Sequence, residues 1–200
     1  EVWQISANLN GPLFVATLGL FGLIGTTFVL VRLPSEVAGL GRFDSWDRVR
    51  AACGGTPAEG FAPSGSRTPP EAALTRAQWG NVGLMVLFGQ MLQVLLVGGL
   101  VFAFLVLLGL LVMPESVVAA WTQLPVRYLG PQLSLLGREV RISEELLRVS
   151  SFLASFSALY FAVTAVTDAS YREEFFEDVV GEVRQTFAVR AAYLDALKPR

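Results

Sequence analysis

The sequence has no histidine, so every histidine-dependent catalytic triad, metal site and proton relay is excluded. Cys53 is the only cysteine, which excludes an intrachain disulfide and a cysteine-rich metal site. Charge is also scarce, because Asp, Glu, Lys and Arg make up 16% of the chain against roughly 25% in ordinary soluble domains. With 15 basic and 17 acidic residues there is no basic surplus to neutralise phosphate, so no nucleic-acid partner is expected.

Apolar residues are abundant instead. They make up 53% of the sequence, and the mean hydropathy is +0.54. Such a composition excludes a disordered chain, which needs low hydrophobicity and high charge. It predicts an all-α integral membrane protein, a helical bundle with about three transmembrane helices and an additional amphipathic helix at the C-terminus. The lipid bilayer is then the first expected partner.

The first predicted membrane segment covers residues 1–33. Its uncharged run, residues 13–31, would rise about 28 Å as a helix, close to the roughly 30 Å hydrocarbon core of a bilayer. Pro12 fits the first helical turn, and Arg32 closes the run. A signal peptide is less consistent with the sequence, because no basic residue precedes Leu13 and the apolar stretch is long.

The second predicted segment, residues 82–113, carries no charge. As one helix it would be about 48 Å long, more than tilt alone absorbs. We expect the helix to begin outside the lipid; a bend or a re-entrant hairpin at Gly98-Gly99 is the alternative. The third segment, residues 150–168, is the least apolar. Ser143 is predicted to cap its helix, with Glu144 and Glu145 in the first turn.

The connections differ in character. Residues 34–81 are predicted to be cytoplasmic and to contain a short amphipathic patch around Trp46, suited to a membrane surface, and a flexible Gly/Pro/Ser-rich linker at residues 53–70. Residues 114–149 are predicted to be external, with a short interfacial helix over 114–124 followed by irregular structure. Trp3, Trp79 and Trp121 flank the three segments, where amphipathic rings prefer the headgroup zone.

The basic residues predict the orientation. Placing the N-terminus outside leaves eleven of the fifteen basic residues on the cytoplasmic side and four outside, and the positive-inside rule favours that arrangement. Lys198 is the only lysine, and the bias toward Arg, Ala, Gly and Leu is typical of GC-rich bacterial genomes. Since the sequence starts at Glu1 and not at a methionine, we expect upstream residues to lie outside this piece, and the span count refers to residues 1–200 only.

A stripe of small residues marks the third segment, at steps of four and three: Ser151, Ser155, Ala158, Ala162 and Ala165. Small side chains let two helices in lipid approach closely. Gly19 and Gly22, with Gly25, give the first segment a similar face. The two faces are predicted to pack within the chain, or to form a seam with a second copy or with another membrane protein.

Gln90 and Gln93 are the strongly polar side chains inside the second apolar run. They would bond across helices or reach interfacial water, or else face an aqueous path in a channel. No Asp, Glu, Lys or Arg lies inside the apolar runs of the three segments, residues 13–31, 82–113 and 150–167, which argues against ion-coupled transport.

The tail, residues 169–200, is predicted to be a cytoplasmic amphipathic helix. Ser170 and Glu173 match a capping box. An apolar stripe with helical spacing follows and forms a predicted interaction face: Phe176, Val180, Val183, Phe187, Ala191 and Leu194. Its acidic first turns favour packing against protein, either under the bundle or on a copy of itself, over binding to a membrane surface.

The tail DASYREEFFEDVVGEVRQTFAVRAAYL loosely resembles the C-terminal tails of uncharacterised multi-span membrane proteins from actinobacteria. The resemblance implies a bacterial inner membrane location and no activity. The expected function is a membrane scaffold or accessory subunit that acts by helix–helix association; the alternative is a channel or transporter subunit. An enzyme is less favoured, because no nucleophile–base pair, metal-ligand set or cofactor loop is recognisable, so no catalytic, metal or cofactor residue is predicted.

Overall fold

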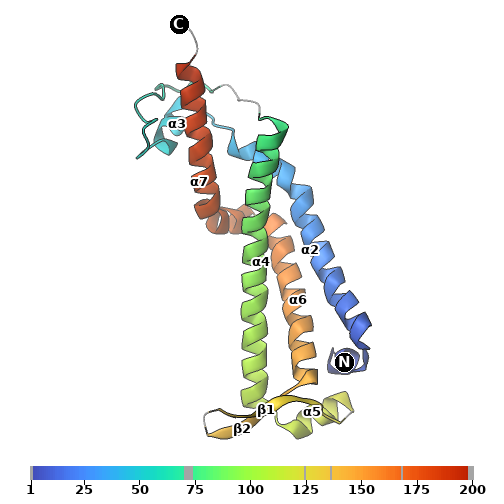
Figure 1. Cartoon of the computed structure of the whole chain (residues 1–200). Helices are drawn as coiled ribbons and strands as arrows, with labels where there is room; N and C mark the ends of the chain where they lie inside the picture. Colours follow the sequence, from blue (N-terminus) through green and yellow to red (C-terminus); the bar gives the residue numbers. More distant parts are fainter. Residues whose placement is uncertain (1, 70–73, 124, 136, 168, 198–200) are drawn as a thin grey trace. The chain divides into compact units, whose positions relative to one another are not determined.

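The chain is mostly helical (Figure 1). The computed structural model describes residues 2–69, 74–123, 125–135, 137–167 and 169–197, and of residues 7, 36, 133, 135, 138, 166 and 169–180 only the backbone. Within this part there are seven helices and one antiparallel pair of strands. The all-α prediction is therefore corrected to a mostly helical fold with one β-hairpin.

Three helices are long and apolar enough to cross a membrane. They are α2 (Gly11–Leu40), α4 (Arg76–Val112) and α6 (Glu144–Thr167). Each overlaps one of the three predicted segments, so the number and order of the long apolar helices agree with the prediction.

Helix α2 continues past the predicted end at Arg32 and includes Pro34. A proline inside a helix removes a backbone hydrogen bond and costs roughly 3 kcal/mol. Val37 and Leu40 lie beyond it and are buried, and their packing accounts for the continuation. Arg32 lies within the helix because its charge ends the apolar run without ending the helical backbone.

Helix α4 is continuous from Arg76 to Val112, without a break at Gly98-Gly99. It begins before the predicted residue 82, as expected for a helix that starts outside lipid. Thr75 and Gln78 form a reciprocal capping box: the Gln78 N–H donates to the Thr75 hydroxyl at 3.3 Å, and the Thr75 N–H donates to the Gln78 side chain at 3.1 Å. This segment forms one helix and not a re-entrant hairpin.

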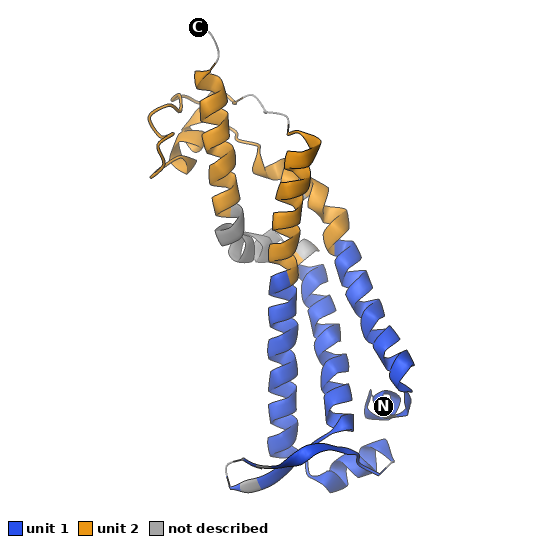
Figure 2. Cartoon of the chain, viewed as in Figure 1, with its two compact units in different colours: residues 1–28, 92–164 blue, residues 29–91, 165–200 orange. Residues whose placement is uncertain are grey.

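The chain divides into two compact units (Figure 2). Unit 1 contains residues 1–28 and 92–164, and unit 2 contains residues 29–91 and 165–200. Helices α2 and α4 contribute residues to both units.

Unit 1 contains most of α6, which packs against α2 and α4. Phe21 of α2 makes edge contacts with Phe152 and Phe156 of α6, at ring-centroid distances of 5.5 and 6.1 Å. Two short helices, α1 (Val2–Asn8) and α5 (Glu115–Thr122), meet through Trp3 and Trp121, whose ring centroids lie 5.6 Å apart.

A β-hairpin in unit 1 replaces the irregular structure predicted before Ser143. Strands β1 (Tyr128–Leu135) and β2 (Arg138–Ser143) pair antiparallel. The register is interrupted between Leu129 and Leu133, and this interruption contains Gly130, at φ 78°, and Pro131. Because the break in the ladder accommodates both residues, the Gly-Pro pair does not prevent strand pairing.

Unit 2 has its own apolar core. Helix α3 (Trp46–Ala52) buries Trp46 and Val49 in it, and α7 (Ala169–Ala196) buries Val183 and Phe187 there. The guanidinium of Arg184 on α7 lies 5.5 Å from the ring centroid of Phe43. The amphipathic patch around Trp46 therefore places its apolar side chains in a protein core rather than on a membrane surface.

The segment predicted to be a flexible linker is a packed loop. Residues 53–69 contain no helix or strand, but Cys53, Ala58 and Ala62 are buried in the core of unit 2. Arg50 of α3 donates two hydrogen bonds to the Ala62 carbonyl oxygen, at 2.9 and 3.2 Å. The small side chains typical of linkers here allow close packing against α3, which composition alone does not reveal.

Candidate functional site

The small-residue stripe of α6 faces other helices of unit 1. A Cβ atom added at Gly98 of α4 would lie 3.1 Å from the Ala158 Cβ. A Cβ atom at Gly25 of α2 would lie 3.7 Å from the Ala162 Cβ. The side chains of Ser151 and Ser155 are half-buried, and Ala165, which belongs to unit 2, is buried. At Ala158 and Ala162 the stripe therefore serves packing within the chain.

Gly19 and Gly22 do not take part in this packing. Both are exposed, and a Cβ atom added at either would meet nothing within 4 Å. Of the small residues predicted on the first segment, Gly25 is thus the one in contact with α6, while Gly19 and Gly22 leave an open face on α2.

The two glutamines of α4 differ in environment. Gln90 is 7% exposed, and its Oε1 atom has no hydrogen-bond partner among the described residues. Gln93 is half-buried and has an interaction partner. Neither glutamine lines the cleft that lies beside the start of α6.

The predicted interaction face of the tail is partly buried and partly exposed along α7. Val183 and Phe187 are buried in the core of unit 2, whereas Leu194 is 38% exposed. The Gln185 side chain donates a hydrogen bond of 3.2 Å to the Gly54 carbonyl oxygen, which fixes α7 against the loop after α3. The side chains of Phe176 and Val180, and the predicted capping box at Ser170 and Glu173, lie outside the part that the structure describes.

Sequence reasoning predicts the cap of α6 correctly but misses a polar cluster beside it. The Leu146 N–H donates to the Ser143 hydroxyl at 3.2 Å. One turn further on, the Arg148 guanidinium pairs with the Glu144 carboxylate and donates to the carbonyl oxygens of Leu9 and Ser6, at 2.7 and 3.3 Å. The side chain of Arg148 is only 18% exposed, so this cation ties the end of α1 to the start of α6.

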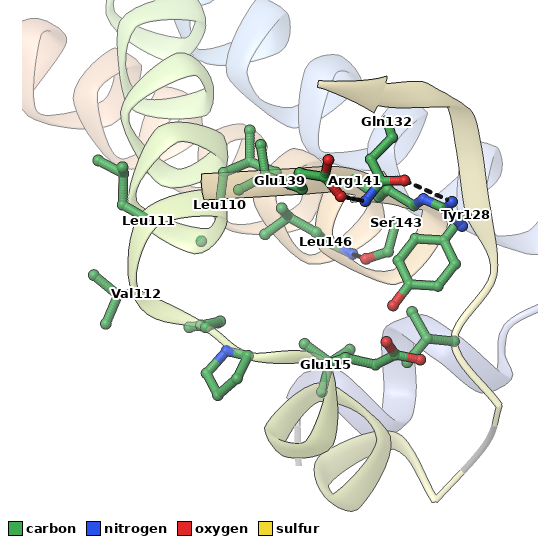
Figure 3. A pocket seen from close by; sticks show the side chains of 16 residues that line it. Leu110, Leu111, Val112, Glu115, Tyr128, Gln132, Glu139, Arg141, Ser143 and Leu146 are labelled. Atoms are coloured by element: carbon green, nitrogen blue, oxygen red, sulfur yellow. Dashed lines mark hydrogen bonds between the residues drawn. The ribbon is translucent and has the colours of Figure 1, made fainter. Parts of the chain in front are cut away.

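A cleft of about 690 Å³ lies beside this end of α6, within unit 1 (Figure 3). Four segments form it: the last turn of α4, the start of α5, the hairpin, and the start of α6. Its apolar wall comes mainly from the end of α4 and from α6, with Leu110, Leu111, Val112, Met113 and Leu146. A cavity of this size falls within the roughly 300–1,000 Å³ of small-molecule sites.

Polar side chains from α5 and the hairpin line the rest of the cleft. The Gln132 amide nitrogen donates to Glu139, and Arg141 donates to the Gln132 amide oxygen at 3.0 Å (Figure 3). The Arg141 guanidinium lies 5.6 Å from the ring centroid of Tyr128. Gln132 therefore links a carboxylate to a guanidinium, and the three side chains form one connected group.

Tyr128 and Glu115 form the second polar group of the cleft. Partial burial, together with a side-chain hydrogen bond to the Glu115 carboxylate and the negative charge of that carboxylate, raises the pKa of Tyr128 to about 12. The phenol is therefore protonated at neutral pH and donates to the carboxylate. Glu115 is exposed at the edge of the cleft, and an ionised carboxylate can accept further hydrogen bonds beyond this one.

The arrangement suits binding rather than nucleophilic catalysis. The lining joins an apolar wall to two carboxylates, a guanidinium, a phenol and the buried hydroxyl of Ser143. Sequence reasoning predicts none of these residues as a site, because they come from four separate segments and share no motif. The one local signal is that an apolar run, residues 110–113, is followed by Pro114 and then by Glu115. No protein-family model, curated protein sequence or solved structure matches this chain.

Proposed function

We propose that the chain is an integral protein of the bacterial inner membrane that acts as a scaffold or accessory subunit, with its N-terminus outside and its C-terminus in the cytoplasm. Helix α4 carries the main observation in support. It is the most apolar of the three long helices, and 6% of its most apolar window is buried. Large apolar side chains are exposed along its length, including Leu84, Phe88, Leu92, Leu95, Leu96, Leu100, Phe104 and Leu107.

Exposed side chains of this kind need a lipid or protein environment. A contiguous apolar surface larger than a few hundred Å² marks a membrane or partner contact. The outward face of α2 adds exposed Val15 and Leu23 beside the open Gly19 and Gly22. Because small residues allow helices in lipid to approach closely, this α2 face is the proposed contact for another helix, from a second copy or from another membrane protein.

The test is Gly22→Leu with Gly99→Leu as its matched control. Both glycines have open space around them, so neither substitution disturbs packing inside the chain. Native mass measurement in nanodiscs, made directly from cell membranes, should give complexes heavier than the 21.6 kDa chain, and Gly22→Leu should reduce their fraction while Gly99→Leu leaves it unchanged. Recovery of the unaltered protein as a single chain without a co-purifying subunit would contradict the proposal.

A channel or transporter subunit is the second candidate, and Gln90 favours it. An amide oxygen that is buried without a hydrogen-bond partner among the residues the structure describes calls for water or a solute, since leaving it unpaired costs roughly 1–3 kcal/mol. Protein reconstituted in liposomes should then pass solute, and Gln90→Leu should lower the flux. Equal flux from Gln90→Leu and the unaltered protein, or none from folded protein, would remove this candidate.

A further inference from the structure

The charges that line the hairpin cleft do not balance. Glu115 and Glu139 supply two carboxylates, and Arg141 supplies one guanidinium. Glu139 and Arg141 are joined through Gln132, which leaves Glu115 as the acid without a cationic neighbour inside this group. Tyr128 supplies Glu115 with a neutral donor, and among the described side chains that line the cleft no cation forms an ion pair with Glu115.

The remaining wall is aliphatic and is continuous with the membrane-spanning run of α4. Leu110, Leu111 and Val112 form the last turn before Pro114, and Glu115 follows directly as the first residue of α5. If α4 crosses the bilayer, this turn lies where hydrocarbon gives way to headgroups. A ligand in the cleft would therefore meet aliphatic side chains at one end and a carboxylate at the other.

We propose that this cleft binds an amphiphile through a primary ammonium head. The ammonium donates to the Glu115 carboxylate, and the hydrocarbon chain lies along Leu110–Val112. A primary ammonium has three donors and one positive charge, which matches an acceptor-only carboxylate that already accepts one hydrogen bond. The same chemistry could come from an ethanolamine phospholipid of the bilayer or from a free long-chain amine. Binding of this kind rests on the proposed membrane location and not on the scaffold role.

The experiment measures lipid binding to the purified full chain in non-ionic detergent by native mass spectrometry. Phosphatidylethanolamine is titrated against phosphatidylglycerol with identical acyl chains, which lacks the ammonium. We expect one site per chain and an affinity for phosphatidylethanolamine at least about tenfold higher, since its ammonium adds charge-assisted hydrogen bonds to the Glu115 carboxylate. Competition by dodecylammonium separates the two sources: tighter binding of the amine indicates a free amine, and tighter binding of the phospholipid indicates bilayer lipid.

Glu115→Gln removes the charge with little change in shape and should lower the affinity for phosphatidylethanolamine by about tenfold. Glu182→Gln is the matched control, because Glu182 is an exposed acid of unit 2 and should have no effect. Equal affinity for the two phospholipids, or unchanged affinity in folded Glu115→Gln, would overturn the proposal. If Glu115→Gln does not fold, the comparison of the two phospholipids on the unaltered chain decides alone.

Discussion

At the scale of single residues, the energetics of this chain depend on a few polar side chains in apolar surroundings. Arg148 is the strongest case, because its guanidinium supplies hydrogen bonds to two backbone carbonyl oxygens and a counter-charge to Glu144. Breaking a largely buried ion pair on one side leaves the partner charge uncompensated. An exposed pair contributes far less, because water and salt screen it.

Glu144 allows these two situations to be compared directly, since it pairs with both Arg148 and Arg127. Arg127 is 75% exposed and its nitrogen lies 3.6 Å from the carboxylate. We expect Arg148→Met to lower the free energy of unfolding by about 3 kcal/mol and Arg127→Met by less than about 1 kcal/mol. Reversible unfolding in mixed micelles measures both. Equal losses would show that the contacts of Arg148 with α1 contribute nothing.

The phenol of Tyr128 gives a pH-dependent prediction. Its pKa is about 12 in the folded chain against a usual value of 10, so the folded chain holds this proton more tightly than the unfolded chain does. The resulting stabilisation is fully present below pH 10 and is lost as the pH rises through about 12. A tyrosinate absorbance titration should show a late step near pH 12, and Tyr128→Phe should remove that step. A late step that persists in Tyr128→Phe would assign it elsewhere.

At the scale of secondary-structure elements, the packing of α6 against α4 depends on a close approach at Gly98. Adding a side chain there forces Ala158 to move, and overpacking of this kind costs roughly 1–3 kcal/mol. At Gly99, the next residue, the space is open, and a larger residue should gain helix propensity of up to about 1 kcal/mol. The two glycines therefore have opposite expected responses.

We predict that Gly98→Leu lowers the free energy of unfolding and that Gly99→Leu leaves it unchanged or raises it slightly. Unfolding in mixed micelles, followed by circular dichroism, measures both variants under the same conditions. Equal losses at the two positions would mean that glycine is needed for backbone reasons and not for the contact with Ala158.

The elements also show which features can be predicted from sequence. The cap of α6 can be predicted, because Ser143 and the acidic residues of the first turn are local signals. The three long helices can also be predicted, because an uncharged apolar run is recognised without knowing its distant contacts. The hairpin cannot be predicted in this way, because Gly130-Pro131 normally breaks a strand. Here an interruption in the strand register accommodates the pair. The burial of Cys53 and Ala62 also depends on distant contacts, with α3 and α7, that composition does not encode.

At the scale of the whole molecule, the proposed orientation in the membrane decides which side of the bilayer each loop and the hairpin cleft would face. It rests on the basic residues, most of which fall in residues 32–76 and in the tail. Cys53 is unsuitable as a reporter of sidedness, because it is buried, and burial together with the nearby charge of Glu59 raises the pKa of its thiol. A reporter cysteine must therefore be placed at an exposed position on each side of the proposed membrane.

Ser66 and Ser134 meet this requirement, since both are exposed, one in the loop after α3 and the other in the hairpin. In a Cys53→Ala background, a membrane-impermeant maleimide added to intact cells should label Ser134→Cys. It should label Ser66→Cys only after the inner membrane is made permeable. The reverse pattern would invert the orientation and place the hairpin cleft in the cytoplasm. Labelling of both cysteines in intact cells would show that the three long helices do not separate these loops across a bilayer.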